Sequence, residues 1–206
     1  TKIAIFGSGA VGGYFGGRLA QAGHDVRFIA RRGHLEAILE DGLHVESLQG
    51  DFTIYPARAS DNPEEIGVVD VVLCGVKSWQ VGGAAEAMRP MVGPETVVIP
   101  LQNGVEAHTT PVEVLGSDHV LPGVCRLISM IQAPGQIAHV GAEPFVSFGE
   151  MDGGASPRAE KIEQAFARAQ GLIVAVADNI LADLWKKFML IAPWSGVGAL
   201  TRAPIG

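Results

Sequence analysis

The 206-residue chain is poor in cysteine and in basic residues. Cys74 and Cys125 are its two cysteines, and without metal-site spacing they are expected to be small buried hydrophobes in a reducing compartment. The six histidines show no ligand spacing either, so we expect no metal. With 15 Lys and Arg against 22 Asp and Glu, and no basic patch, the composition argues against a nucleic-acid partner.

Long apolar runs are also missing. None approaches the ~20 residues that span a bilayer, and Lys2 leads into a short apolar run and a glycine turn, not a signal peptide. These absences predict a cytoplasmic protein with no membrane partner. The length is nevertheless enough to bury a full core and exceeds that of a typical single domain.

Glycine, in contrast, is abundant, with 27 residues. Its most informative cluster follows the apolar run 2–6 and opens a helical segment that closes at Gly23. This context predicts a pyrophosphate bound on a helix N-terminus. The residues expected to bind it are Gly7, Ser8, Gly9, Ala10, Val11 and Gly12.

Each glycine of this motif has its own purpose. Gly7 permits the tight turn, Gly9 lets phosphate approach the backbone, and Gly12 lets the helix lie close on the sheet. The same helix contains Gly13, Gly16 and Gly17, each costing about 0.5–1 kcal/mol relative to alanine. That cost is justified only in a helix pressed against a sheet or a cofactor.

A basic pair follows the second apolar run. Many dinucleotide sites place an acidic residue after this strand, but here residues 25–30 are followed by Arg31 and Arg32. A guanidinium can hold a phosphate dianion in a fork. The pair therefore favours NADP, used as NADPH, over NAD.

The order of segments predicts an α/β fold. Strands and helices alternate through the first half, which indicates a Rossmann-type, doubly wound, mostly parallel sheet. Short strands within residues 127–149, joined by glycine-containing turns, are expected to form an antiparallel extension of it. A helix over 156–169 and a strand over 172–176 complete a predicted NADP-binding domain of residues 1–177.

From residue 178 the pattern becomes helical. Apolar residues recur at helical spacing around Leu184 and Phe188, which places Lys186 opposite the stripe and Lys187 at its edge. We expect residues 178–206 to be the first helix of an all-helical second domain whose remainder is missing, with Pro193 kinking or ending the helix. The apolar stripe would then need a cover, and we expect a homodimer. Trp79 and Trp185 are expected in the core.

Four further motifs, in this order and spacing, resemble those of the ketopantoate (2-dehydropantoate) reductase family over nearly the whole chain. They are Val76-Lys77-Ser78-Trp79-Gln80, Leu101-Gln102-Asn103-Gly104, Pro134-Gly135-Gln136-Ile137-Ala138-His139 and Leu184-Trp185-Lys186-Lys187-Phe188. The resemblance implies an oxidoreductase that uses NADPH to reduce a 2-keto acid to a 2-hydroxy acid, the pantoate step of pantothenate biosynthesis.

The resemblance also implies roles for single residues. Lys187 would be the general acid, Asn103 would hold the carbonyl or the nicotinamide, Lys77 would line the cofactor cleft, and Arg31 would bind the 2′-phosphate. These types suit the chemistry, because hydride arriving at a keto carbon creates an alkoxide that needs a proton and a positive neighbour. Each residue also has a simpler alternative. Lys187 could cover apolar surface with its side chain, Asn103 could belong to a plain Asn-Gly turn, and Lys77 could lie in solvent at the end of a strand.

The sequence departs from the family pattern after the lysine. Ile191 and Ser195 stand where the family places asparagine, one and two turns further along the helix. An apolar wall changes which substrates are discriminated, so the substrate is either 2-dehydropantoate or a related 2-keto acid. Two other functions stay open at this point: a dinucleotide-sensing module without catalysis, and another dehydrogenase of the same two-domain architecture.

Overall fold

The computed structural model describes residues 1–203, in which two β-sheets enclose helix α1 (Ala10–Gln21). The first sheet has the strand order β5-β2-β1-β6-β7, and all its neighbouring strands are parallel. Its strands are β1 (Lys2–Phe6), β2 (Asp25–Ile29), β5 (Ala59–Ser60), β6 (Val69–Cys74) and β7 (Val92–Pro100). This arrangement confirms the predicted Rossmann-type parallel sheet.

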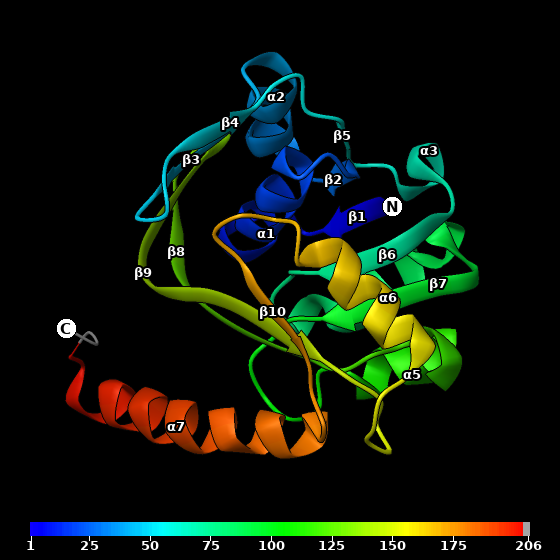
Figure 1. Cartoon of the computed structure of the whole chain (residues 1–206). Coiled ribbons are helices and arrows are strands. Elements are labelled where there is room, and N and C mark those ends of the chain that lie inside the picture. Colours follow the sequence, from blue (N-terminus) through cyan, green and yellow to red (C-terminus); the bar gives the residue numbers. More distant parts are fainter. Residues whose placement is uncertain (204–206) are drawn as a thin grey trace.

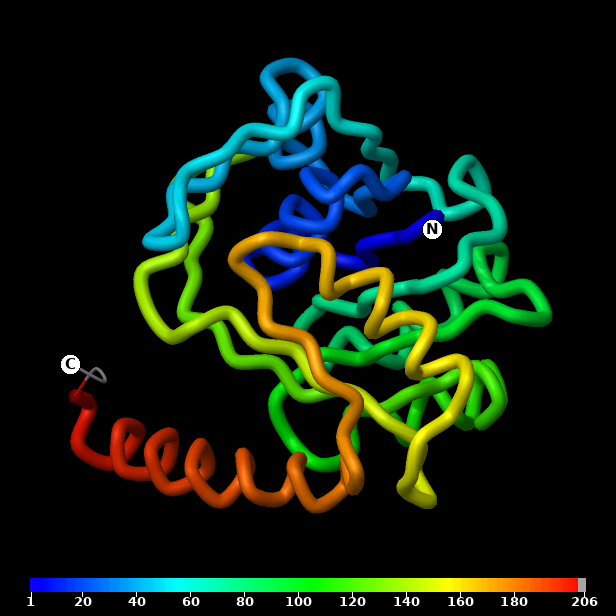
Figure 2. Tube along the Cα trace, viewed as in Figure 1, coloured from blue at the N-terminus to red at the C-terminus, as the bar shows by residue number. Residues whose placement is uncertain are grey.

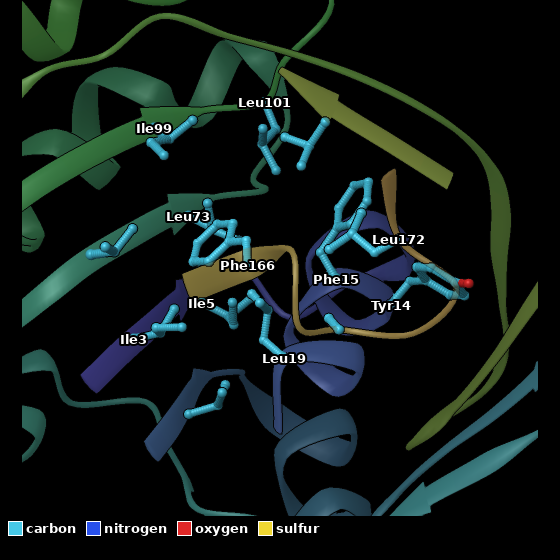
Figure 3. Packing of buried hydrophobic residues seen from close by; sticks show 14 of the residues in the cluster. Ile3, Ile5, Tyr14, Phe15, Leu19, Leu73, Ile99, Leu101, Phe166 and Leu172 are labelled. Carbon is cyan, nitrogen blue, oxygen red and sulfur yellow. The ribbon is translucent and has the colours of Figure 1, made fainter. Parts of the chain in front are cut away.

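Both faces of this sheet are covered, which explains why its central strands β1 and β6 are almost entirely apolar and buried. In β1, Ile3 and Ile5 face one cluster of core residues, with α1 and α6 (Pro157–Phe166), as Figure 3 shows. Ala4 and Phe6 face a second cluster with α3 (Pro63–Ile66) and α4 (Val81–Ala87). Helices therefore cover both faces, as a doubly wound fold requires.

The segment expected to extend the first sheet forms a second sheet instead, with the order β10-β9-β3-β4 and β8 paired to β9. Its strands are β3 (Leu43–Ser47), β4 (Phe52–Ile54), β8 (Gly123–Ala133), β9 (Gln136–Phe148) and β10 (Ile173–Val176). Strands β3 and β4 pair antiparallel, and β3 also pairs in parallel with β9. Figure 1 shows this sheet curving around the side of α1 that is opposite the first sheet.

The position of α1 explains its glycines. A Cβ at Gly16 would press on Ile5 and Phe28 of the first sheet, whereas a Cβ at Gly13 or Gly17 would press on Ile137 or Phe52 of the second. Glycines on two helix faces thus let both sheets approach the same helix. The predicted close packing is confirmed, and the second sheet is what presses on the helix from the other side.

Helix α7 (Ile180–Thr201) runs along the lower edge of the molecule in Figures 1 and 2. Asn179 caps it by accepting a hydrogen bond from the N–H of Ala182. The helix does not end at Pro193, although that residue deprives one carbonyl of its helical donor. Ile180 and Leu184 are buried, but Trp185 is exposed, contrary to its predicted place in the core.

The remaining helices are α2 (Arg32–Glu40) and α5 (Thr109–Leu115), with 3₁₀ turns at Ser78–Gln80, Arg89–Met91 and Ser117–His119. Two of these turns, Ser78–Gln80 and Arg89–Met91, flank α4. Within residues 1–203, no helix combines the length and the apolarity that crossing a bilayer demands.

Candidate functional site

The glycine turn between β1 and α1 is tightly built. Gly7 has φ +97°, a conformation that side chains disfavour, and a Cβ there would meet the backbone of Val76. The N–H and the hydroxyl of Ser8 both donate to the carbonyl of Ile29, each at 3.0 Å. The turn is therefore fixed to the end of β2. The N–H and the hydroxyl of Ser8 already have acceptors within the protein.

The first turn of α1 is open to an anion. The N–H groups of Ala10, Val11 and Gly12 have no acceptor inside the helix, because the first turn of any helix lacks one. Gly9 precedes them, and a Cβ at Gly9 would lie 3.8 Å from Ile131. No acidic side chain occupies this turn. The helix dipole and free donors suit a phosphate group.

A cavity of ≈ 520 Å³ lies beside this turn. It is lined by the turn, the ends of β1 and β2, Arg31, His34, Lys77 and Trp79. Arg31 is exposed and precedes α2, whereas Arg32 is not among the lining residues. Trp79 is 82% exposed, contrary to its predicted place in the core. Trp79 follows Lys77 shortly after the end of β6, and this position at a strand end could have suggested a place in the cleft.

A second cavity of ≈ 330 Å³ continues from the first. Both are bordered by residues 75–77 and by Trp79, so they form one cleft along the carboxyl ends of the parallel strands. Ligands of doubly wound sheets bind at that edge. The second cavity brings together Lys77, Asn103, Cys125 and Lys187, from four separate segments.

Lys187 enters this cavity from α7. Its side chain is half-buried, and its Nζ donates a hydrogen bond to the carbonyl of Cys125. Lys186, in contrast, is exposed and pairs with Asp183 at 2.9 Å. The helical-spacing prediction for the two lysines is therefore confirmed. Burial raises the pKa of the Cys125 thiol, and the nearby charge of Lys187 opposes that rise.

Asn103 and Gln102 follow β7 at the same edge. Asn103 is exposed to the cavity, while Gln102 is buried and its Nε2 donates to the carbonyls of Cys74 and Val76, at 2.8 and 3.0 Å. Gln102 thus fixes the end of β6 that leads to Lys77, and its buried Oε1 has no partner among the described residues. Sequence reasoning missed Gln102, although its place at a strand end beside Asn103 was a usable signal.

The remaining residues singled out in the sequence are two positions on α7 and the two cysteines. Ile191 and Ser195 are on α7, one half-buried and one exposed. Cys74 and Cys125 are free and buried, as predicted. Among residues 1–203, no three His, Cys, Asp or Glu side chains are grouped so as to hold a metal ion.

A parallel doubly wound sheet, an open helix N-terminus after a glycine turn, and a long cleft along the strand ends define a Rossmann-type nucleotide-binding domain. Comparison with known proteins is more specific. Residues 3–153 match the model of the family described as ketopantoate reductase PanE/ApbA. The chain belongs to the ketopantoate reductase family, a family of oxidoreductases.

Individual relatives agree with this assignment. The chain is 32% identical to the uncharacterized oxidoreductase YkpB of Bacillus subtilis, over 100% of this chain and 67% of that protein. It is 33% identical to a 2-dehydropantoate 2-reductase of Mesorhizobium japonicum, over 99% and 68%. The crystal structure of 2-dehydropantoate 2-reductase from Geobacter metallireducens matches with a TM-score of 0.93 and 35% identity, over 100% and 67%. The chain spans about two thirds of the length of its curated relatives.

Proposed function

We propose that this chain contains the cofactor site and the general acid of an enzyme that reduces a 2-keto acid with NADPH, with 2-dehydropantoate or a close analogue as the substrate. Membership of the ketopantoate reductase family, and the likeness to relatives named 2-dehydropantoate 2-reductase, support this proposal. The observation that carries the proposal is Lys187, whose ammonium group reaches the cavity that also holds Asn103 and Lys77.

The cofactor fits the residues present. Its diphosphate would lie on the free N–H groups that begin α1, its adenosine half in the cavity beside Arg31, and its nicotinamide in the cavity beside Asn103. When bound, the reduced nicotinamide supplies hydride to the keto carbon. Arg31 would hold the 2′-phosphate that distinguishes NADPH from NADH.

The residues of the chain supply the rest of the chemistry. The amide of Asn103 donates a hydrogen bond that orients the keto group or the nicotinamide. Lys187 places a positive charge beside the keto oxygen and transfers a proton from Nζ to it as the carbonyl is reduced. In the structure this Nζ donates a hydrogen bond to the carbonyl of Cys125, which holds the lysine at the cavity and leaves its other N–H groups for a substrate oxygen.

The role of Lys187 can be tested by comparing it with its neighbour Lys186 on the same helix. Lys187→Ala is expected to lower the rate of NADPH oxidation by 2-keto acids by about 10²–10⁴-fold, the usual contribution of a general acid. NADPH affinity, measured by calorimetry, should stay within about threefold. Lys186→Ala, which removes an exposed lysine of the same helix, should leave both unchanged.

Two outcomes contradict the proposal. Equal turnover by the Lys187→Ala variant and the unaltered protein would remove the lysine from the chemistry. NADPH binding with no turnover of any 2-keto acid in the unaltered protein would favour a dinucleotide-sensing module instead.

A further inference from the structure

His34 connects two distant parts of the cleft wall. It lies on α2, and its Nε2 is 2.7 Å from the carbonyl oxygen of Ser8. Its Nδ1 accepts a hydrogen bond of 3.0 Å from the N–H of Gly135, 101 residues further along the chain. Both nitrogens of this half-buried ring are thus engaged with backbone groups.

These two partners fix the protonation of the ring. A backbone N–H can only donate, so Nδ1 must be unprotonated. A carbonyl can only accept, so Nε2 must carry the hydrogen and donate it to Ser8. The ring is therefore a neutral imidazole in one tautomer. It lines the larger cavity but has no free donor to offer an anion there.

One bond of His34 acts on the glycine turn. The N–H and hydroxyl of Ser8 are already bound to Ile29, and His34 holds its remaining polar group, the carbonyl. Because a peptide unit is planar, fixing the carbonyl of Ser8 also fixes the direction of the next N–H, that of Gly9. Gly9 begins the anion-binding end of α1.

The other bond holds the second sheet in place. Gly135 lies in the turn between β8 and β9, with φ +72°, and its carbonyl accepts from the N–H of His44 on β3. A Cβ at Gly135 would lie 3.1 Å from Ala37 of α2, so the turn rests directly on the helix that bears His34. Strand β8 leads into this turn, and it contains Cys125, whose carbonyl accepts the hydrogen bond from Lys187.

We propose that His34 is a positioning residue for dinucleotide binding: a neutral imidazole that joins the Ser8–Gly9 peptide to the β8–β9 turn and so orients the donors at the start of α1. It acts through the backbone and contributes no charge to the cofactor. The proposal rests on the proposed function and adds to it a determinant of cofactor affinity that lies outside the glycine motif.

Substitutions that keep one bond each can separate this role from simple stabilisation. In His34→Gln the side-chain amide nitrogen replaces Nε2 and can still donate to Ser8, but the bond to Gly135 is lost. In His34→Asn the amide oxygen replaces Nδ1 and can still accept from Gly135, but the bond to Ser8 is lost. His34→Leu loses both. His44→Leu is the matched control, since its ring contacts the Thr53 hydroxyl at the surface.

Calorimetric titration with NADPH, with thermal unfolding of each variant, provides the test. We expect His34→Gln to bind within about threefold of the unaltered protein, and His34→Asn and His34→Leu about tenfold more weakly, the effect of one net hydrogen bond. In turnover assays KM for NADPH should rise while kcat is preserved. His44→Leu should bind normally.

The results that overturn the inference are specific. His34→Leu binding as tightly as the unaltered protein would refute it, as would equal weakening of the Gln and Asn variants in step with lower unfolding temperatures. If the unaltered protein binds neither NADPH nor NADH, the proposed function fails and the inference fails with it. Binding by the unaltered protein without a difference among the variants defeats the inference alone.

Discussion

Arg31 is the single residue to which we assign the choice between NADPH and NADH. It borders the larger cavity next to the end of β2, and none of the ion pairs among residues 1–203 engages it. Its guanidinium is thus available to a phosphate. A charge-assisted hydrogen bond contributes about 1.5–3 kcal/mol, so we expect Arg31→Ala to bind NADPH about 10- to 100-fold more weakly.

NADH affinity should be unaffected by that substitution, because NADH lacks the 2′-phosphate. Arg32→Ala is the control, since Arg32 is its neighbour but does not line the cavity. Paired titrations with both dinucleotides measure the ratio directly. A ratio that is unchanged in Arg31→Ala, or that changes equally in Arg32→Ala, would contradict the assignment.

Contacts between residues close together in the sequence could be predicted, whereas contacts between residues far apart in the sequence could not. The glycine turn was predictable because a strand, a turn and a helix are consecutive in the sequence. The different exposures of Lys186 and Lys187 followed from helical periodicity alone. His34 was not predictable, since its partners are 26 and 101 residues away and its bonds are to backbone groups that any sequence would supply.

Among the elements, the strand pairing of the second sheet could not be predicted from the sequence. Strands were predicted within residues 127–149 and over 172–176, but the residue pattern of a strand does not identify the strand with which it pairs. The parallel pairing of β3 with β9 joins residues 44–47 to residues 136–139 and separates these strands from the first sheet. The glycines of α1 held part of that information, since they require close neighbours on two helix faces.

The junction of β9 and α6 depends on a partly buried ion pair. Arg158 of α6 forms a two-pronged pair with Glu150, which follows β9, and also donates to the carbonyl of Asp118. The hydrogen bond from Arg158 holds the pKa of the Glu150 carboxyl below its ordinary value of 4.5. A depressed carboxyl pKa adds stability above pH 4.5, and that stability is lost as the pH falls through the lowered pKa.

Glu150→Gln is therefore expected to lower the free energy of unfolding by about 1 kcal/mol near pH 7. The difference from the unaltered protein should shrink as the pH drops below 4.5, which urea unfolding at several pH values would measure. Glu86→Gln removes a solvent-exposed pair with Arg89 and should have no measurable effect. A difference that persists unchanged at low pH would show that the charge of Glu150 is not its cause.

For the whole molecule, the question is whether residues 1–177 fold and bind as a unit, as we propose. Two large clusters of buried apolar residues lie within this range, and α7 contributes only to a small third cluster, through Ile180 and Leu184. Its remaining large apolar side chains are mostly exposed. Helix α7 thus supplies Lys187 to the cleft without supplying much of the core.

A chain that ends at Asp178 is accordingly expected to fold and to bind NADPH within about fivefold of the unaltered protein, while showing no turnover because Lys187 is gone. Losing the burial of Ile180 and Leu184 should cost about 3–6 kcal/mol, so its unfolding temperature should fall while the transition stays cooperative. Circular dichroism melting and calorimetric titration measure the two properties separately. A shortened chain that unfolds without cooperativity, or that no longer binds NADPH while Lys187→Ala still does, would place α7 inside the cofactor-binding domain.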